Sequence, residues 1–128
     1  MEQESLILDG GQLTGPQVTA VARKGIRVEI GETATSLMHS ARETVENRIK
    51  SGSPTYGINT GFGALSTTSI SHKKLDELQM NILRSHAAGV GDPLDGEIVR
   101  GMMLLLAASL CRGHSGARPI VAETIVQM

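Results

Sequence analysis

The first candidate for chemistry is Tyr56, in the glycine-rich stretch TYGINTGFGALS at residues 55–66. It is the only tyrosine in the 128-residue chain; the only phenylalanine, Phe62, lies in the same stretch, and there is no tryptophan. Aromatic residues that build a core are normally spread along buried faces. A tyrosine hydroxyl can transfer protons when its pKa is lowered and a closing loop positions it over a substrate. The stretch therefore predicts either a catalytic loop that carries Tyr56 or a turn in which the ring only packs.

The glycines of this stretch, Gly57, Gly61 and Gly63, allow positive φ angles or close backbone approach. A P-loop requires a lysine after its glycines, and none follows here. A dinucleotide-binding fingerprint requires G-x-G-x-x-G between a strand and a helix. The spacing here is G-x-x-x-G-x-G and it follows a helical pattern, so no nucleotide is expected.

The second candidate is His86, which stands at helical spacing from Leu75, Leu78 and Ile82. This spacing predicts that its ring lies on the apolar face and points inward. Such an imidazole is either a satisfied core residue or a group that offers one hydrogen bond to a substrate in an apolar pocket.

The other side chains with possible chemistry favour structural interpretations. The remaining histidines are not spaced as metal ligands, with one another or with carboxylates, so no metal is expected; they are His39, His72 and His114. Cys111 is the only cysteine, which excludes an internal disulfide, and it is expected to be an inert core thiol. Arg112 and Arg118 flank GHSGA and could bind an anion, but surface charges at a helix end are the favoured interpretation.

The elements that must position these residues are mostly helical. Short strands are expected at SLIL, before Asp9, and at IRVEI. Apolar periodicity, N-cap residues and glycine or proline stops predict helices at about residues 14–23, 32–49, 73–88, 95–112 and 119–128. The second helix repeats Leu37, Ala41, Val45 and Ile49 along one face. Without a linker or repeat, residues 1–128 are expected to form one domain that ends inside a helix, with no separate second domain.

Composition narrows the function classes. A net charge of −1 without a basic block argues against nucleic acid as a partner. The longest largely apolar run, residues 102–110, is too short to span a membrane, and the N-terminus lacks a secretory signal pattern. A cytoplasmic protein is therefore expected. The apolar helices at 95–112 and 119–128 are expected to expose surface that drives oligomerisation.

Three blocks together resemble one family. TYGINTGFG, LQMNILRSHAAGVGDPL and RGMMLLLAASLCRGHSGARP occur in the order and spacing found in the N-terminal region of aromatic amino acid ammonia-lyases and aminomutases. These enzymes use a self-made methylidene-imidazolone electrophile. The resemblance implies a mainly α fold, in which a small N-terminal α+β segment is followed by helices that join a long helical bundle, as in histidine ammonia-lyase.

The resemblance also implies roles for individual residues. Tyr56 would be the base on a mobile loop that removes the β-proton of the substrate, with Gly63 lining the site. His86 would contact the aromatic ring of the substrate. The loop would be supported by Gly57, Asn59, Gly61 and Phe62. The implied reaction is loss of ammonia from L-histidine or a similar aromatic amino acid to give the α,β-unsaturated acid.

The chain departs from the family pattern in one important respect. The family builds its electrophile from Ala-Ser-Gly, and these 128 residues contain no such triad; the nearest strings are AAS at 107–109 and SGA at 115–117. A companion chain that carries the triad, a longer parent chain, or a non-catalytic binding or regulatory role would each account for this. SHAAGVG is typical of histidine-type members, whereas GHSGARP is closer to tyrosine aminomutases, so histidine is the first expected substrate and tyrosine or phenylalanine the alternative.

Overall fold

The computed structural model describes residues 5–61 and 74–128, which group into two compact units. Unit 1 comprises Met1–Thr44 and Pro93–Met128, and unit 2 is Val45–Asp92. The described elements are β1 (Ser5–Leu8), α1 (Gly15–Lys24), β2 (Arg27–Ile30), α2 (Glu32–Ser51), α3 (Leu75–His86), α4 (Gly96–Cys111) and α5 (Pro119–Gln127). The mainly helical fold and the small α+β start are therefore confirmed. The expectation of one domain over residues 1–128 stays a prediction.

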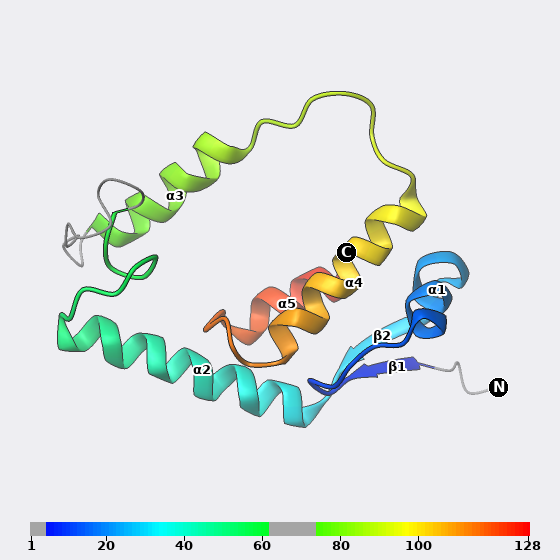
Figure 1. Ribbon diagram of the computed structural model, residues 1–128, viewed down its shortest axis with the longest axis horizontal. Helices are drawn as coiled ribbons and strands as arrows, with labels where there is room; N and C mark the ends of the chain where they lie inside the picture. The colour runs from blue at the N-terminus through cyan, green and yellow to red at the C-terminus, as the bar shows by residue number, and fades with distance from the viewer. Residues whose placement is uncertain (1–4, 62–73) are drawn as a thin grey trace. The chain divides into compact units, whose positions relative to one another are not determined.

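The N-terminal part of unit 1 is a β-α-β arrangement. Strands β1 and β2 pair in parallel, from Ser5 opposite Arg27 to Leu8 opposite Ile30, and α1 connects them (Figure 1). Helix α1 begins at the predicted cap, where the Gln17 side-chain oxygen accepts hydrogen bonds from the Thr14 backbone N–H at 2.8 Å and from its hydroxyl at 2.9 Å. It ends at Gly25, whose left-handed backbone lets its N–H reach the carbonyl of Val21.

The core of unit 1 forms around α4, which packs against α1 and α5 (Figure 1). Its buried residues are small or flexible apolar side chains, as the near absence of aromatics predicts. They are Leu8, Val21, Ala34, Met38, Leu104, Ala107, Cys111 and Ala122. Burial raises the pKa of the Cys111 thiol, so the expected inert core cysteine is confirmed as a buried one.

Helix α2 departs from the predicted pattern at Leu37, whereas Ala41, Val45 and Ile49 are half-buried as the repeat predicts. Ala34 and Met38 are buried, whereas Leu37, which was expected on the buried face, is 42% exposed. Leu37 nevertheless supports the turn after α4, because a Cβ on Gly113 would lie 2.7 Å from its backbone carbonyl. Gly113 and Gly116 both have positive φ, and they reverse the chain between α4 and α5.

Helices α4 and α5 expose apolar side chains, as expected. On α4 these include Met102, Leu105 and Leu106, each more than half exposed, and on α5 Ile120 is 56% exposed. Among the described residues, no helix has the length and apolar character needed to cross a membrane.

Candidate active site

The Tyr56 turn follows α2 in unit 2. The carbonyl of Thr55 accepts hydrogen bonds from the backbone N–H groups of Ile58, at 3.0 Å, and Asn59, at 3.2 Å. Gly57 has φ +76°, a left-handed conformation that other residues adopt at a cost. The predicted loop is thus, up to residue 61, an ordered turn whose geometry depends on glycine.

Asn59 holds the two sides of this turn together. Its side-chain oxygen accepts a hydrogen bond from the Thr55 N–H at 2.7 Å, and its amide nitrogen donates to the Ser53 carbonyl at 3.0 Å. Asn59 and the adjacent Thr60 are only 5% and 1% exposed, and the Thr60 hydroxyl donates to the carbonyl of Gly61. The side chain of Asn59 therefore links the backbone before Tyr56, at Ser53 and Thr55, to residue 59 after it.

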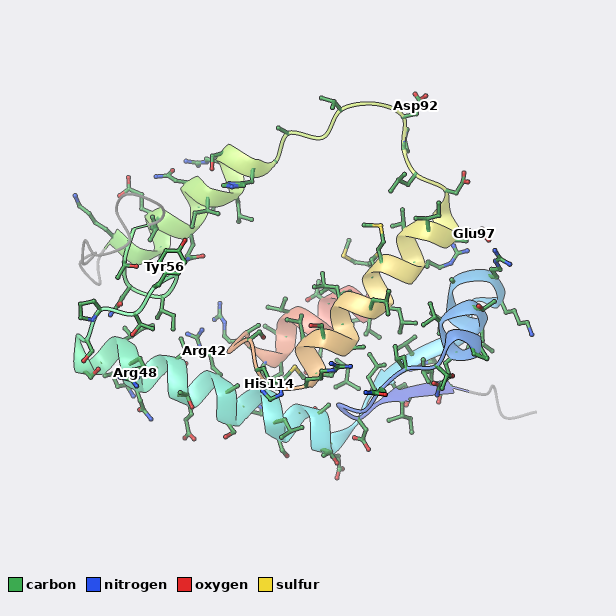
Figure 2. All side chains as sticks on the ribbon, in the orientation of Figure 1. Arg42, Arg48, Tyr56, Asp92, Glu97 and His114 are labelled. Carbon is green, nitrogen blue, oxygen red and sulfur yellow. The ribbon has the colours of Figure 1, made fainter. Side chains whose placement is uncertain are left out.

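Tyr56, by contrast, is 64% exposed. Figure 2 labels its position in the segment after α2. An accessible side chain on a fixed backbone is compatible with contact to a ligand. Phe62 and Gly63, the remaining predicted residues of this loop, lie outside the described residues.

His86 is the last residue of α3, and its position corrects one expectation. It shares a helix face with Ile82, as the spacing predicts, but it does not point into an apolar interior: its side chain is exposed. The reason is that α3 has no buried side chain among those described; Leu78 and Ile82 are half-buried and Leu83 is 65% exposed. The His86 side chain is therefore accessible at the end of α3 and is not covered by apolar neighbours in the described part of the chain.

Sequence reasoning missed Ser85, which lies beside His86. Its hydroxyl oxygen is 2.9 Å from His86 Nδ1 and 3.0 Å from the carbonyl oxygen of Ile82, and His86 Nδ1 is itself 2.9 Å from that carbonyl. The sequence did contain a sign of these contacts, namely a serine next to a histidine in the last turn of a predicted helix. Serine hydroxyls in helices often bond to the carbonyl three or four residues earlier.

The other candidates keep structural interpretations. Arg112 and Arg118 are exposed and flank the ends of α4 and α5, as favoured from sequence. His39 and His114 are exposed, and His72 lies outside the described residues. Within the described ranges, no group of three or more His, Cys, Asp or Glu side chains is arranged to hold a metal ion.

Comparison with known proteins identifies the family. Residues 13–128 match the family described as aromatic amino acid lyase. The chain belongs to that family. It is 46% identical over 117 residues to histidine ammonia-lyase of Symbiobacterium thermophilum, covering 91% of this chain and 23% of that protein.

Solved structures of the family have the same fold. The histidine ammonia-lyase of Trypanosoma cruzi matches with a TM-score of 0.85 and 38% identity, over 97% of this chain and 24% of that one. The tyrosine aminomutase of Streptomyces globisporus matches with a TM-score of 0.89 and 31% identity, over the same shares. The chain thus spans about a quarter of the length of the relatives it matches.

The aromatic amino acid lyases depend on methylidene-imidazolone, and the residues here do not fit its formation. Ala107, Ala108 and Ser109 lie inside α4, with Ala107 fully buried, so their backbone is held in a helix. Ser115, Gly116 and Ala117 form the turn before α5, in the wrong order for Ala-Ser-Gly. The described structure therefore offers a base and a ring contact as candidates, but no source of the electrophile.

Proposed function

We propose that the chain is the N-terminal part of an aromatic amino acid ammonia-lyase that acts on L-histidine. The observation that carries the proposal is the exposed Tyr56 on a turn fixed by Asn59, within a chain that matches the aromatic amino acid lyase family over residues 13–128. In the proposed reaction the C–N bond to the amino group breaks, the β-proton is removed, and a C=C bond forms. The products are ammonia and the α,β-unsaturated acid.

Tyr56 is the proposed base. The hydroxyl of an exposed tyrosine on an anchored turn can be held within hydrogen-bond reach of a substrate proton, which is the geometric requirement for general base catalysis. The β-proton is weakly acidic, so positioning of the base supplies part of the rate. Closure of the loop over the substrate, with Phe62 packing it and Gly63 lining the site, belongs to the same proposal.

His86 is the proposed contact to the aromatic ring of the substrate. Its exposed ring at the end of α3 can meet a ligand directly. An imidazole offers one hydrogen bond to the imidazole of histidine or the hydroxyl of tyrosine.

The electrophile and the carboxylate-binding groups would come from outside these 128 residues. A companion chain with Ala-Ser-Gly, or a further segment of the same polypeptide, would supply them. The exposed apolar residues of α4 and α5 support association with such a segment or with further copies of the chain. A cytoplasmic location stays a prediction.

A 2,3-aminomutase acting on tyrosine or phenylalanine is the second candidate. It is favoured by GHSGARP and by the likeness to the Streptomyces globisporus tyrosine aminomutase. In a mutase, ammonia adds back at the β-carbon, so the amino acid product, and not the unsaturated acid, would accumulate. A non-catalytic binding or regulatory role is the alternative of another class, motivated by the missing triad.

One experiment tests these possibilities together. The assembly that contains this chain is purified under mild conditions, the intact mass of every chain is measured, and turnover of L-histidine is compared for the wild type and Tyr56→Phe. A chain two waters lighter than its encoded sequence would reveal the cyclised electrophile. Loss of a general base predicts a fall in turnover of about 100-fold or more for Tyr56→Phe, with unchanged assembly, because the side chain is 64% exposed.

The matched control is Ile7→Val, an equally small change at a residue of unit 1 that is 58% exposed, which should leave turnover unchanged. Wild-type activity in Tyr56→Phe would refute the role of Tyr56. An assembly without any electrophile-bearing chain would refute the lyase and support the non-catalytic alternative.

A further inference from the structure

The last turn of α3 brings three polar atoms into mutual contact. They are the carbonyl oxygen of Ile82, the hydroxyl oxygen of Ser85 and the ring nitrogen Nδ1 of His86, and each pair is separated by 2.9 or 3.0 Å. Such a closed group of three can contain only certain arrangements of protons.

The carbonyl of Ile82 decides between these arrangements, because it can only accept hydrogen bonds. Both of its neighbours must therefore act as donors toward it. His86 Nδ1 can do so only if it carries the proton. The Ser85 hydroxyl then donates to the same carbonyl, and the single Nδ1–H proton is shared between the carbonyl and the Ser85 oxygen, so that every contact contains a proton.

The opposite tautomer satisfies fewer contacts. With the proton on Nε2, Nδ1 presents a lone pair to the Ile82 carbonyl at 2.9 Å, and two acceptors face each other. Ser85 has only one proton, and wherever it donates, the contact between Nδ1 and the carbonyl contains none. Ser85 thus takes part in two contacts that contain a proton in the Nδ1–H form, and contributes one proton in the Nε2–H form.

We propose that Ser85 and the Ile82 carbonyl hold the neutral ring of His86 as the Nδ1–H tautomer, so that Nε2 faces the ligand as an acceptor. This inference rests on the proposed function for the identity of the ligand. A substrate ring that meets Nε2 must carry a donor at its far end, as the N–H of imidazole or the O–H of phenol does. A phenyl ring carries none and leaves Nε2 unpaired. Ser85 is accordingly a positioning residue that acts through His86.

Nitrogen NMR of the histidine-labelled chain tests the proposal directly. At a pH at which the rings are neutral, the shifts and ring-proton couplings of His86 should identify Nδ1 as the protonated nitrogen and Nε2 as the unprotonated one. His39 and His114, both exposed and in unit 1, give reference signals in the same spectrum. A predominant Nε2–H form of His86 would overturn the proposal.

Variants of Ser85 test whether its hydroxyl favours the Nδ1–H tautomer of His86. Ser85→Ala should lower the ratio of Nδ1–H to Nε2–H by roughly fivefold, the factor expected for one net hydrogen bond. Ser85→Thr should restore the ratio, because a threonine hydroxyl also reaches the carbonyl one turn back. Ser85 is exposed, so neither change should unfold the chain, and Ser36→Ala on an exposed face of α2 is the control. An unchanged ratio in Ser85→Ala would remove Ser85 from the proposal.

This outcome is independent of the proposed lyase activity. An Nδ1–H ring in an assembly that does not turn over histidine would refute the activity alone. Turnover with an Nε2–H ring would refute the tautomer alone.

Discussion

Different interactions stabilise the interior of each of the two units. The buried side chains of unit 1 are apolar and come from strands and helices far apart in the sequence, such as Leu8, Met38 and Leu104. The buried side chains described in unit 2 are polar, Asn59 and Thr60, and their partners are backbone groups one to six residues away. Apolar packing therefore stabilises unit 1, whereas local hydrogen bonds shape the described part of unit 2.

The candidate site falls entirely in unit 2. Tyr56 and His86 are exposed there, on a turn and on a helix end that have little apolar cover of their own. Elements with few buried contacts are also those that open and close most readily. The two units thus differ in that unit 1 contains the apolar core and unit 2 contains the candidate site residues. Three pairs of variants test this contrast.

The largest effect is expected from truncating a core methionine. Met38 is 1% exposed in unit 1, and Met38→Ala should reduce the free energy of unfolding by about 2–5 kcal/mol through lost burial and the cavity left behind. The same substitution at Met80, 48% exposed in unit 2, should cost less than about 1 kcal/mol. Denaturant unfolding of both variants, followed by circular dichroism, measures the difference.

Hydrogen exchange locates the loss within the chain. In Met38→Ala, peptides of β1, α1 and α4 should exchange faster, while those of the Tyr56 turn should not. If Met80→Ala destabilised the chain as much as Met38→Ala, unit 2 would have an apolar core of its own and the contrast would fail.

A smaller difference is expected between two glycines of equal backbone conformation. Gly113 in unit 1 and Gly52 in unit 2 both have φ +69°. A Cβ on Gly113 would lie 2.7 Å from the backbone of Leu37, whereas a Cβ on Gly52 would have nothing within 4 Å. Gly52→Ala should cost about 1 kcal/mol, the left-handed penalty alone, and Gly113→Ala at least about twice as much, because α2 must shift.

Thermal unfolding of the two alanine variants measures this comparison. Equal shifts in Tm would mean that the contact with Leu37 does not limit the packing of the turn. A larger shift for Gly52→Ala would contradict the tighter packing of unit 1.

Much of unit 1 could be predicted from sequence because its signals are local. Thr14, Gly25 and Pro119 mark helix ends by their own chemistry, and the strands and all helices of unit 1 lie within a few residues of their predicted positions. The buried stripe of α2 was less predictable. Leu37 and Met38 are adjacent apolar residues, and only tertiary packing decides that Met38 joins the core cluster while Leu37 stays 42% exposed.

The sequence predicted which residues are candidates for the site, but not how exposed they are or what they contact. Composition drew attention to Tyr56 and helical spacing to His86, and the family resemblance gave both a role. Spacing could not show that His86 is exposed, because an apolar face is buried only if another element covers it. The contacts of Ser85 and the inward side chain of Asn59 depend on backbone geometry, which residue types alone do not specify.

The most local effect, and the one closest to the site, concerns Asn59. Asn59→Ala removes the acceptor of the Thr55 N–H and the donor to the Ser53 carbonyl, two hydrogen bonds of about 1 kcal/mol each. Exchange of the Thr55 amide should become about fivefold faster, since one such bond is lost directly from that group. The stability of unit 1 should not change. The control is Asn81→Ala, the same substitution at an exposed position of α3 in the same unit.

Residue-resolved hydrogen exchange by NMR decides the outcome. Faster exchange at Thr55 in Asn59→Ala alone would establish that a single side chain holds the turn under Tyr56. The same loss should lower turnover in the complete enzyme less than Tyr56→Phe does, because the hydroxyl remains and only its position is loosened. Unchanged protection of Thr55 would mean that backbone hydrogen bonds to the Thr55 carbonyl suffice, and that the buried asparagine does not position the proposed base.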